Sequence, residues 1–184
     1  TEGPVVPGDA TGIFSAGASS NQTFAYNVTA SVSASAEFND PLGLYNPATS
    51  TYTIGTSGEH QFAGQVGFFN PTSGDPLTTS RVTLFLQVGG TLVDSVSRDF
   101  TSASGIGPFY LNVGAVGNYS TSSQVKLLVL YQIVITSGSP ATSMTLFQTG
   151  TQFSCTNAPV TYNGASIDMG LQWQPENKNN PYSR

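Results

Sequence analysis

Apolar and polar residues alternate with a period of two along most of the chain after residue 21. This is the period of a β-strand with one buried face, because successive side chains of a strand point to opposite sides. Thr, Val, Tyr and Phe, which favour strands, fill these stretches. The pattern predicts strands in the segments 22–34, 50–55, 59–70, 80–90, 91–100, 108–117, 124–136 and 143–154. The 3.6-residue period of an amphipathic helix does not occur.

Clusters of Gly, Pro, Ser and Asn separate the predicted strands at short intervals. Many short strands with such spacing predict an antiparallel β-sandwich or barrel. Gly89-Gly90 lies between two apolar runs and predicts a two-residue hairpin, because glycine tolerates positive φ at both positions. In the first segment, the alternation predicts one strand with Phe24, Tyr26 and Val28 on the same face.

The two ends of the chain differ in composition from its middle. Residues 1–20 combine prolines, glycines and small residues, which predicts a linker or an arm from a preceding region. Residues 21–174 are predicted to form the folded domain, with a further hairpin at Asn163-Gly164. The apolar pattern ends after Trp173, so residues 175–184 are predicted to be a flexible tail.

Charge is scarce, at 8% of the residues against about 25% in an average soluble protein. Five Lys and Arg residues and a net charge of −5 leave no basic patch for a phosphate backbone, so nucleic-acid binding is not expected. The most apolar segment, 125–135, is too short to span a bilayer as a helix, and we expect no membrane insertion. Neutral polar residues must therefore form most of the surface.

The residue types that most enzymes need are sparse. His60 is the single histidine, and in a strand it is expected to face solvent or to hydrogen-bond rather than to act as a general base. The carboxylates are scattered and indicate no catalytic pair. Asp40 and Asp75 lie in loops that suit a hard cation or a turn cap, and we expect a turn cap at both. Cys155 is expected to be buried. We therefore predict no enzymatic activity, no metal and no cofactor.

Segment 38–69 reads FNDPLGLYNPATSTYTIGTSGEHQFAGQVGFF. It resembles the complement globular-head and tumour necrosis factor superfamily, whose motif is Tyr-Asp-Pro-x-Thr-Gly-x-Phe-Thr-x-Pro-x-x-Gly-x-Tyr-x-Phe after a Phe-Asp-like turn. The hairpin at Gly89-Gly90 stands where the family has Asn-Gly, and Phe153-Ser154 resembles its closing element, although Cys155 follows in place of Gly. The matching positions of the motif are Phe38, Tyr45, Pro47, Thr49, Tyr52, Thr53, Gly58, His60 and Phe62.

The resemblance covers residues 37–155 and implies an all-β fold, an antiparallel β-sandwich of the ten-stranded jelly-roll type. It also implies a homotrimer with apolar and aromatic residues along its axis. Segments 62–69 and 125–135 contain apolar residues on both faces, as expected where one face meets the core and the other a neighbouring subunit. A strand buried on both faces within a monomer is the alternative.

Domains of this family form the heads at the ends of stalks, collagens and viral or phage fibres. The low charge, the Thr/Ser/Asn/Gly-rich loops and the linker-like start favour the viral or phage use. This predicts a trimeric, non-enzymatic head of a spike or fibre, on the virion surface or otherwise extracellular, that binds a host-surface glycan or protein. Residues 1–20 are expected to contact a neighbouring virion or stalk protein. The candidate ligand-binding residues are aromatic and amide residues of predicted loops: Tyr110, Asn112, Tyr119, Asn163 and Trp173.

Two other functions remain open at this point. A capsid shell, vertex or decoration protein would use the arm and the tail to clamp neighbouring subunits, and it would bind only assembled particles. A carbohydrate-binding module of an enzyme would be a monomer with a flat aromatic strip.

Overall fold

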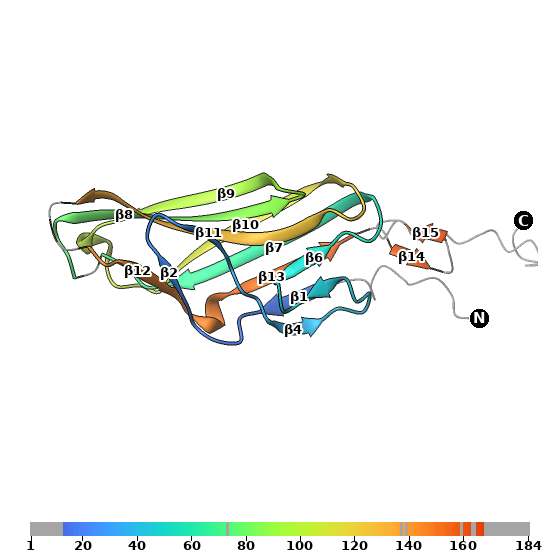
Figure 1. Ribbon diagram of the computed structural model, residues 1–184, viewed down its shortest axis with the longest axis horizontal. Coiled ribbons are helices and arrows are strands. Elements are labelled where there is room, and N and C mark those ends of the chain that lie inside the picture. The colour runs from blue at the N-terminus through green and yellow to red at the C-terminus, as the bar shows by residue number, and fades with distance from the viewer. Residues whose placement is uncertain are drawn as a thin grey trace, which may run out of the picture.

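Two antiparallel sheets pack against each other in the computed structural model of this protein (Figure 1). The structure describes residues 13–72, 74–136, 138, 140–158, 160–162 and 165–167. The seven-stranded sheet has the order β2-β12-β7-β13-β1-β4, and β10 pairs with β7. Its strands are β1 (Phe14–Gly17), β2 (Gln22–Ala25), β4 (Ala36–Asn39), β7 (Gly58–Phe68), β10 (Phe109–Tyr119), β12 (Ser143–Leu146) and β13 (Gln152–Asn157).

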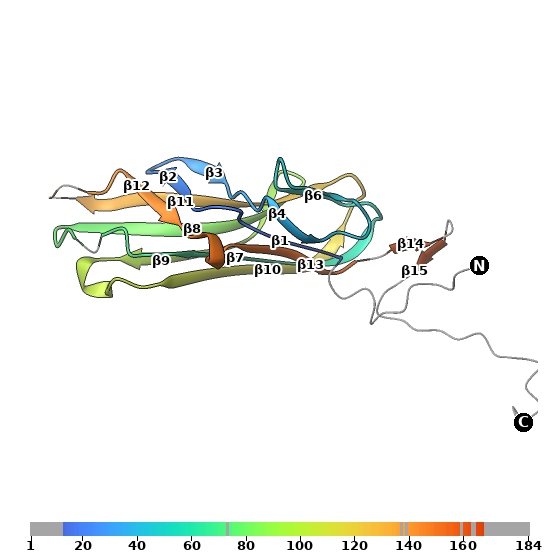
Figure 2. The same ribbon diagram turned by 90° about the horizontal axis from the view of Figure 1, so that it is seen from below.

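The six-stranded sheet has the order β5-β6-β11-β8-β9, and β3 pairs with β11. The long strands β7 to β11 run lengthwise through the molecule in both views (Figures 1 and 2). The strands of this sheet are β3 (Thr29–Ser31), β5 (Tyr45–Asn46), β6 (Thr51–Thr53), β8 (Thr78–Val88), β9 (Thr91–Phe100) and β11 (Gln124–Thr136).

Two short 3₁₀ turns, η2 (Ser102–Ser104) and η3 (Gln148–Gly150), are the helical elements of the part of the chain that the structure describes. None of the helical segments in that part has the length and apolar content of a bilayer span. The all-β prediction is therefore confirmed, and so is the antiparallel sandwich. The number of strands differs from the expected ten, because the first half of the sandwich is divided into short strands.

The hairpin predicted at Gly89-Gly90 forms. β8 and β9 pair from Val88 opposite Thr91 onward, and the intervening Gly89 and Gly90 have φ values of 58° and 84°. These positive values are the reason that glycine is needed at both positions. Near the end of the described chain, β14 (Val160–Tyr162) pairs with β15 (Ala165–Ile167), while Asn163-Gly164 lie outside the described residues.

The single strand predicted for residues 22–34 is wrong. Phe24 is buried in β2 of the seven-stranded sheet, but the chain then crosses to β3 of the six-stranded sheet. Asn27 has a φ of 57° at the crossing, where its backbone N–H donates to the Tyr131 carbonyl (2.6 Å). The crossing leaves Tyr26 and Val28 42% and 53% exposed, so they do not share the buried face of Phe24.

Phe14 of β1 lies at the centre of an aromatic core. Its ring stacks on Tyr45 and on Tyr52, with centroids 4.8 Å and 4.7 Å away, and meets Phe153 edge-on at 4.9 Å. Burial raises the pKa of Tyr45 to about 12, and its hydroxyl donates to the Ala34 carbonyl (2.6 Å). Tyr45 therefore connects β5 to β1 through its ring and to Ala34, just before β4, through its hydroxyl.

The predicted linker of residues 1–20 is therefore wrong over β1. The small and apolar residues there, which have the composition of a linker, form a strand that pairs with β13 on one side and with β4 on the other. Ile13, Phe14 and Ala16 are almost completely buried. Residues 1–12 and the predicted tail, residues 175–184, lie outside the described residues.

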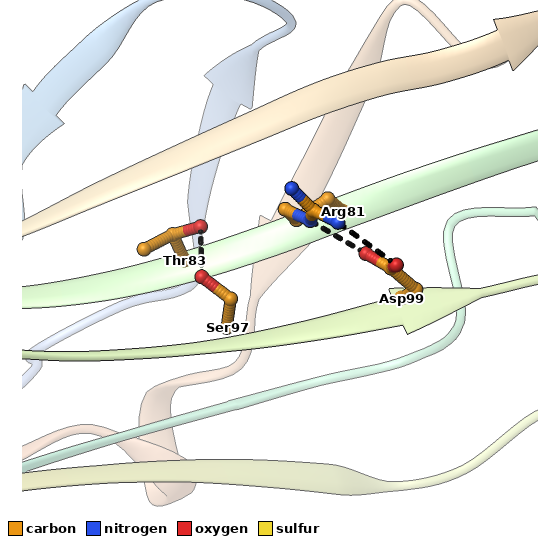
Figure 3. Close-up of polar contacts among 4 residues, drawn as sticks. All are labelled: Arg81, Thr83, Ser97 and Asp99. Atoms are coloured by element: carbon orange, nitrogen blue, oxygen red, sulfur yellow. Dashed lines mark hydrogen bonds and ion pairs between the residues drawn. The ribbon is translucent and has the colours of Figure 1, made fainter.

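Polar pairs cover the outer surface of the six-stranded sheet where β8 and β9 lie side by side. Arg81 donates from Nε and one Nη to both carboxylate oxygens of Asp99 (2.6 Å and 3.0 Å), and the Thr83 and Ser97 hydroxyls share a hydrogen bond of 2.8 Å (Figure 3). The guanidinium of Arg81 lowers the pKa of Asp99. Both charged side chains are exposed, so this pair fixes the strand register more than it stabilises the fold.

The position of Phe14 gives a direct test of the corrected domain boundary. We expect Phe14→Ala to lower the free energy of unfolding by about 3–5 kcal/mol, since it empties the centre of a packed aromatic cluster. Phe38→Ala is the matched control, because Phe38 lies on the adjacent β4 and is 70% exposed. It should cost less than about 1 kcal/mol. Equal stabilities of the two variants in chemical denaturation would show that β1 is not part of the core.

Candidate functional site

The face of the seven-stranded sheet that points away from the sandwich is open along β7, β10 and β13. Alternation along these strands sends Phe62, Val66, Leu111, Val113 and Phe153 into the core. The opposite positions form what we call the outer face. They are Glu59, Gln61, Ala63, Gln65 and Gly67 on β7, Tyr110, Asn112, Gly114, Val116 and Asn118 on β10, and Gln152, Ser154 and Thr156 on β13.

Strand register brings three carboxamides into one row on the outer face. Asn112 of β10 is opposite Gln65 of β7, which is opposite Gln152 of β13. We call these three residues the amide row. Neighbouring strands are about 4.8 Å apart, so the row spans roughly 10 Å across the sheet.

Small residues lie next to the amide row. The adjacent register position contains Gly114, Ala63 and Ser154 on the same three strands. Because their side chains are short, the surface is hollowed beside the longer amides, over a volume of about 160 Å³. The carboxamides of the amide row thus border the hollow on one side, and small residues form its base.

The amide row has unused hydrogen-bonding capacity. Gln65 Nε2 donates to the Gly150 carbonyl at 3.3 Å. Within the described part of the chain, neither Asn112 nor Gln152 has a hydrogen-bond partner for its side chain, and both are exposed. Each carboxamide offers two N–H donors and an acceptor oxygen. The row can therefore both donate to and accept from a ligand.

An aromatic corner, formed by Phe69, Tyr110 and Phe147, borders the outer face on the side of the amide row opposite the hollow. The Phe147 ring meets Tyr110 edge-on at 5.7 Å and lies 5.5 Å from Phe69. The ring also rests on Gly67, where an added Cβ would come within 2.5 Å of it. Glycine at this position is thus required for the ring to reach Tyr110, which is 47% exposed.

Charge is nearly absent from the outer face, where Glu59 is the one carboxylate and none of the positions is Lys, Arg or His. A second carboxylate approaches from β9, the edge strand of the other sheet. Asp94 accepts a hydrogen bond from the backbone N–H of Gly114 (2.9 Å), beside the hollow. Asp94 therefore places a carboxylate beside the hollow, whereas Arg98, the one basic residue of β9, lies over the ring of Phe109.

The structure brings two of the five predicted ligand residues together and separates a third. Tyr110 and Asn112 point outward from the same strand, two residues apart. Tyr119 points to the inner side of that strand, where its ring lies 5.9 Å from Phe62 and burial raises its pKa. Asn163 and Trp173 lie outside the described residues.

Sequence reasoning missed three members of the site, Gln65, Gln152 and Phe147. Each belongs to a strand or turn far from residues 110–112 in the chain, so only the sheet register reveals that they are neighbours. The signal was present as polar or small residues at the outward positions of otherwise apolar strands.

The second apolar face expected for 62–69 is limited to small residues and Phe69, because Ala63, Gln65 and Gly67 occupy its outward positions before the exposed Phe69. On β11, Leu128 and Leu130 are half-buried on the side away from the core. A contact of either segment with a neighbouring subunit stays a prediction.

The acidic loops are turn caps, as predicted. Asp40 accepts from the backbone N–H groups of Leu44 (3.1 Å) and Tyr45 (2.8 Å). Asp75 accepts from the Leu77 N–H (2.9 Å) and the Thr78 hydroxyl (2.6 Å). Among the described residues, no group of three His, Cys, Asp or Glu side chains is arranged to share a metal ion. Cys155 is fully buried, and burial raises the pKa of its thiol to about 12.

His60 is one of the most buried polar residues of the core, at 1% exposed. Its Nδ1 is 2.9 Å from the Gly58 carbonyl and therefore carries a proton, because a carbonyl can only accept. The imidazole stacks on Phe62 with centroids 5.7 Å apart. Burial lowers its pKa. Of the two environments predicted for His60, the hydrogen-bonded one is confirmed.

Comparison with known proteins identifies the fold of this chain. At the level of sequence, no protein-family model and no curated protein matches the chain. The structure is similar to that of Eiger TNF from S. frugiperda, with a TM-score of 0.51 and 6% identity over 83% of this chain and 95% of the other. It is also similar to the globular domain of zebrafish complement 1qA protein, with a TM-score of 0.48 and 16% identity over 76% of this chain and 93% of the other. The first similarity shows that the chain has the jelly-roll fold of the tumour necrosis factor type.

Burial of His60 should make stability depend on pH. The pKa is lower in the folded state than its usual value of about 6.5, so the folded state binds fewer protons. As the pH falls from about 7.5 to about 5.5, the wild type should lose stability relative to His60→Gln, by at most about 1.4 kcal/mol per pH unit. Denaturation of both proteins at each pH measures the difference, and the other titrating groups cancel. A difference that stays constant over this range would contradict the burial of a neutral imidazole.

Proposed function

We propose that this chain is a non-enzymatic head domain that assembles as a homotrimer and binds a host-surface glycan or protein, at the end of a viral or phage spike or fibre. The observation that carries the proposal is the outer face, where a hollow bordered by amides lies on one side of the amide row and an exposed aromatic corner on the other, on a surface with little charge. A surface that offers hydrogen bonds without charge suits recognition by contact rather than acid-base chemistry.

The environments of the reactive residues support a non-enzymatic role. The imidazole of His60 is shielded from solvent in the core, and so is the thiol of Cys155. Asp40 and Asp75 are engaged in capping turns. A general base must reach the proton that it abstracts, and a buried imidazole with a lowered pKa is poorly placed for that role.

Exposed apolar side chains support assembly. Leu77, Val134 and Ile135 lie together where β8 begins and β11 ends, with Ile135 opposite Thr79, and they are 56%, 46% and 64% exposed. A cluster of this kind is commonly covered by another chain. It lies on the six-stranded sheet and leaves the outer face of the other sheet free for a ligand.

The assembly can be measured by size-exclusion chromatography with light scattering. Three chains of 19.2 kDa give an expected mass of about 58 kDa (3 × 19.2). We expect Ile135→Glu to shift the population toward the monomer, because a buried unpaired carboxylate is costly. Leu92→Glu is the control, since Leu92 is 51% exposed at the β8–β9 hairpin, at the other end of these strands. A wild-type protein that is monomeric at micromolar concentration would refute the trimer.

Adsorption separates the proposed role from a cementing role. The isolated trimer should adsorb to host cells at the same level with or without assembled particles. A protein that binds only assembled particles would instead be a capsid cement, and the attachment role would fail.

A further inference from the structure

We infer that the outer face is a binding site for a neutral glycan, one sugar ring of which occupies the hollow beside the amide row. The inference rests on the proposed function as a binding head and narrows its ligand from any host-surface molecule to one chemical class. Neither Gln65 nor Gln152 was a candidate from the sequence, and both become specificity-determining residues here.

The amide row matches the hydrogen-bonding character of a sugar. A sugar hydroxyl both donates and accepts, and so does a carboxamide, so each contact can be made in either direction. Asn112 and Gln152 are without partners among the described residues, and Gln65 has its acceptor oxygen left after its Nε2 bonds to Gly150. Three amides about 4.8 Å apart can hold several hydroxyls of one ring.

The aromatic corner supplies the second element of sugar recognition, an apolar platform for a neighbouring ring of the same glycan, across the amide row from the hollow. Tyr110 is two residues from Asn112 on the same strand and meets Phe147 edge-on at an interplanar angle of 87°. An aromatic ring contacts the C–H groups of a ligand with its face and leaves its hydroxyl available at the rim. Because Phe147 is fixed on Gly67, the platform is rigid before the ligand arrives.

The charge distribution selects against acidic glycans. None of the outward positions of β7, β10 and β13 is Lys or Arg. Anionic groups are recognised chiefly by such residues. The nearest ionised group to the hollow on the edge strand is the carboxylate of Asp94, bonded to the Gly114 N–H, and it would repel a sialyl or sulfate group. A neutral hexose or N-acetylhexosamine has no charge for this carboxylate to repel.

The size of the hollow limits its occupant to a single ring. Its volume of about 160 Å³ is below the roughly 300–1,000 Å³ of sites that enclose a whole drug-sized ligand. The remainder of a glycan would extend over the open sheet, so we expect weak binding by each chain and strong binding by an assembly with several sites.

A second copy of the chain is the competing occupant of this face. A flat protein neighbour would have to remove water from three carboxamides and pair each of them, and any left unpaired would cost binding energy. Neither the row nor the hollow offers a continuous apolar surface to compensate. The chemistry therefore favours a ligand that is itself rich in hydroxyls.

The test uses the full-length protein on an array that carries lactose, N-acetyllactosamine, methyl glucoside, sialyllactose and heparin fragments. We expect binding to at least one neutral probe and none to the sialylated or sulfated ones. Asn112→Ala and Gln152→Ala should each weaken binding of the neutral probe about three- to tenfold, as expected for one lost neutral hydrogen bond. Gln124→Ala is the matched control, because Gln124 is an exposed amide on β11 of the six-stranded sheet, away from the outer face.

Folding and mass are measured for every variant by denaturation and light scattering. Three results would overturn the inference: binding only to acidic probes, binding to no probe, or a fall in mass for Gln152→Ala that identifies the face as a contact between copies. Each leaves the proposed function standing if the wild type is trimeric and adsorbs to cells. Conversely, if the wild type is a monomer that binds a neutral sugar, the trimer is refuted and the glycan site is supported.

Discussion

The stacking of Phe14 between Tyr45 and Tyr52 is the contact on which the rest of the sandwich depends. Tyr45 and Tyr52 pair with each other across β5 and β6 in the six-stranded sheet, whereas Phe14 belongs to β1 in the other sheet. The stack therefore joins the two layers on the side where β1 and β4 of one sheet meet β5 and β6 of the other. It also fixes β1 beside β13, and β13 in turn supplies Gln152 and Ser154 to the outer face. The position of the candidate site is thus set by aromatic packing on the opposite side of the same sheet.

Two kinds of glycine shape the surface that results. Gly89 and Gly90 act through their backbone, because they adopt positive φ at a hairpin. Gly67 acts through its missing side chain, because Phe147 lies directly against it. If Gly89 and Gly90 were replaced, the strands β8 and β9 would lose their register. A side chain at position 67 would push the aromatic corner away from the sheet, although the core beneath would be almost unchanged.

Elements that one local rule decides could be predicted from the sequence, whereas contacts between distant segments could not. Alternation identified the long strands, and the turn caps at Asp40 and Asp75 followed from their neighbours in the chain. The linker-like composition around Phe14 concealed a core strand, because burial there depends on Tyr45 and Phe153, which no local pattern reveals. Tyr110 and Asn112 were found as an exposed aromatic and an amide, but their partners Gln65 and Gln152 become neighbours only through register. Tyr119 was misplaced because it lies at an inward position of β10, whereas Tyr110 and Asn112 lie at outward positions of the same strand.

The scarcity of charge on the outer face has a consequence for the medium in which the protein can work. Attraction between ionised groups at a surface is screened over about 8–10 Å at physiological ionic strength and over shorter distances in stronger salt. Neutral hydrogen bonds and aromatic contacts have no such dependence. A contact made through Asn112, Gln65 and Gln152 would therefore keep its strength from fresh water to brine, whereas its rate of formation would gain nothing from long-range steering.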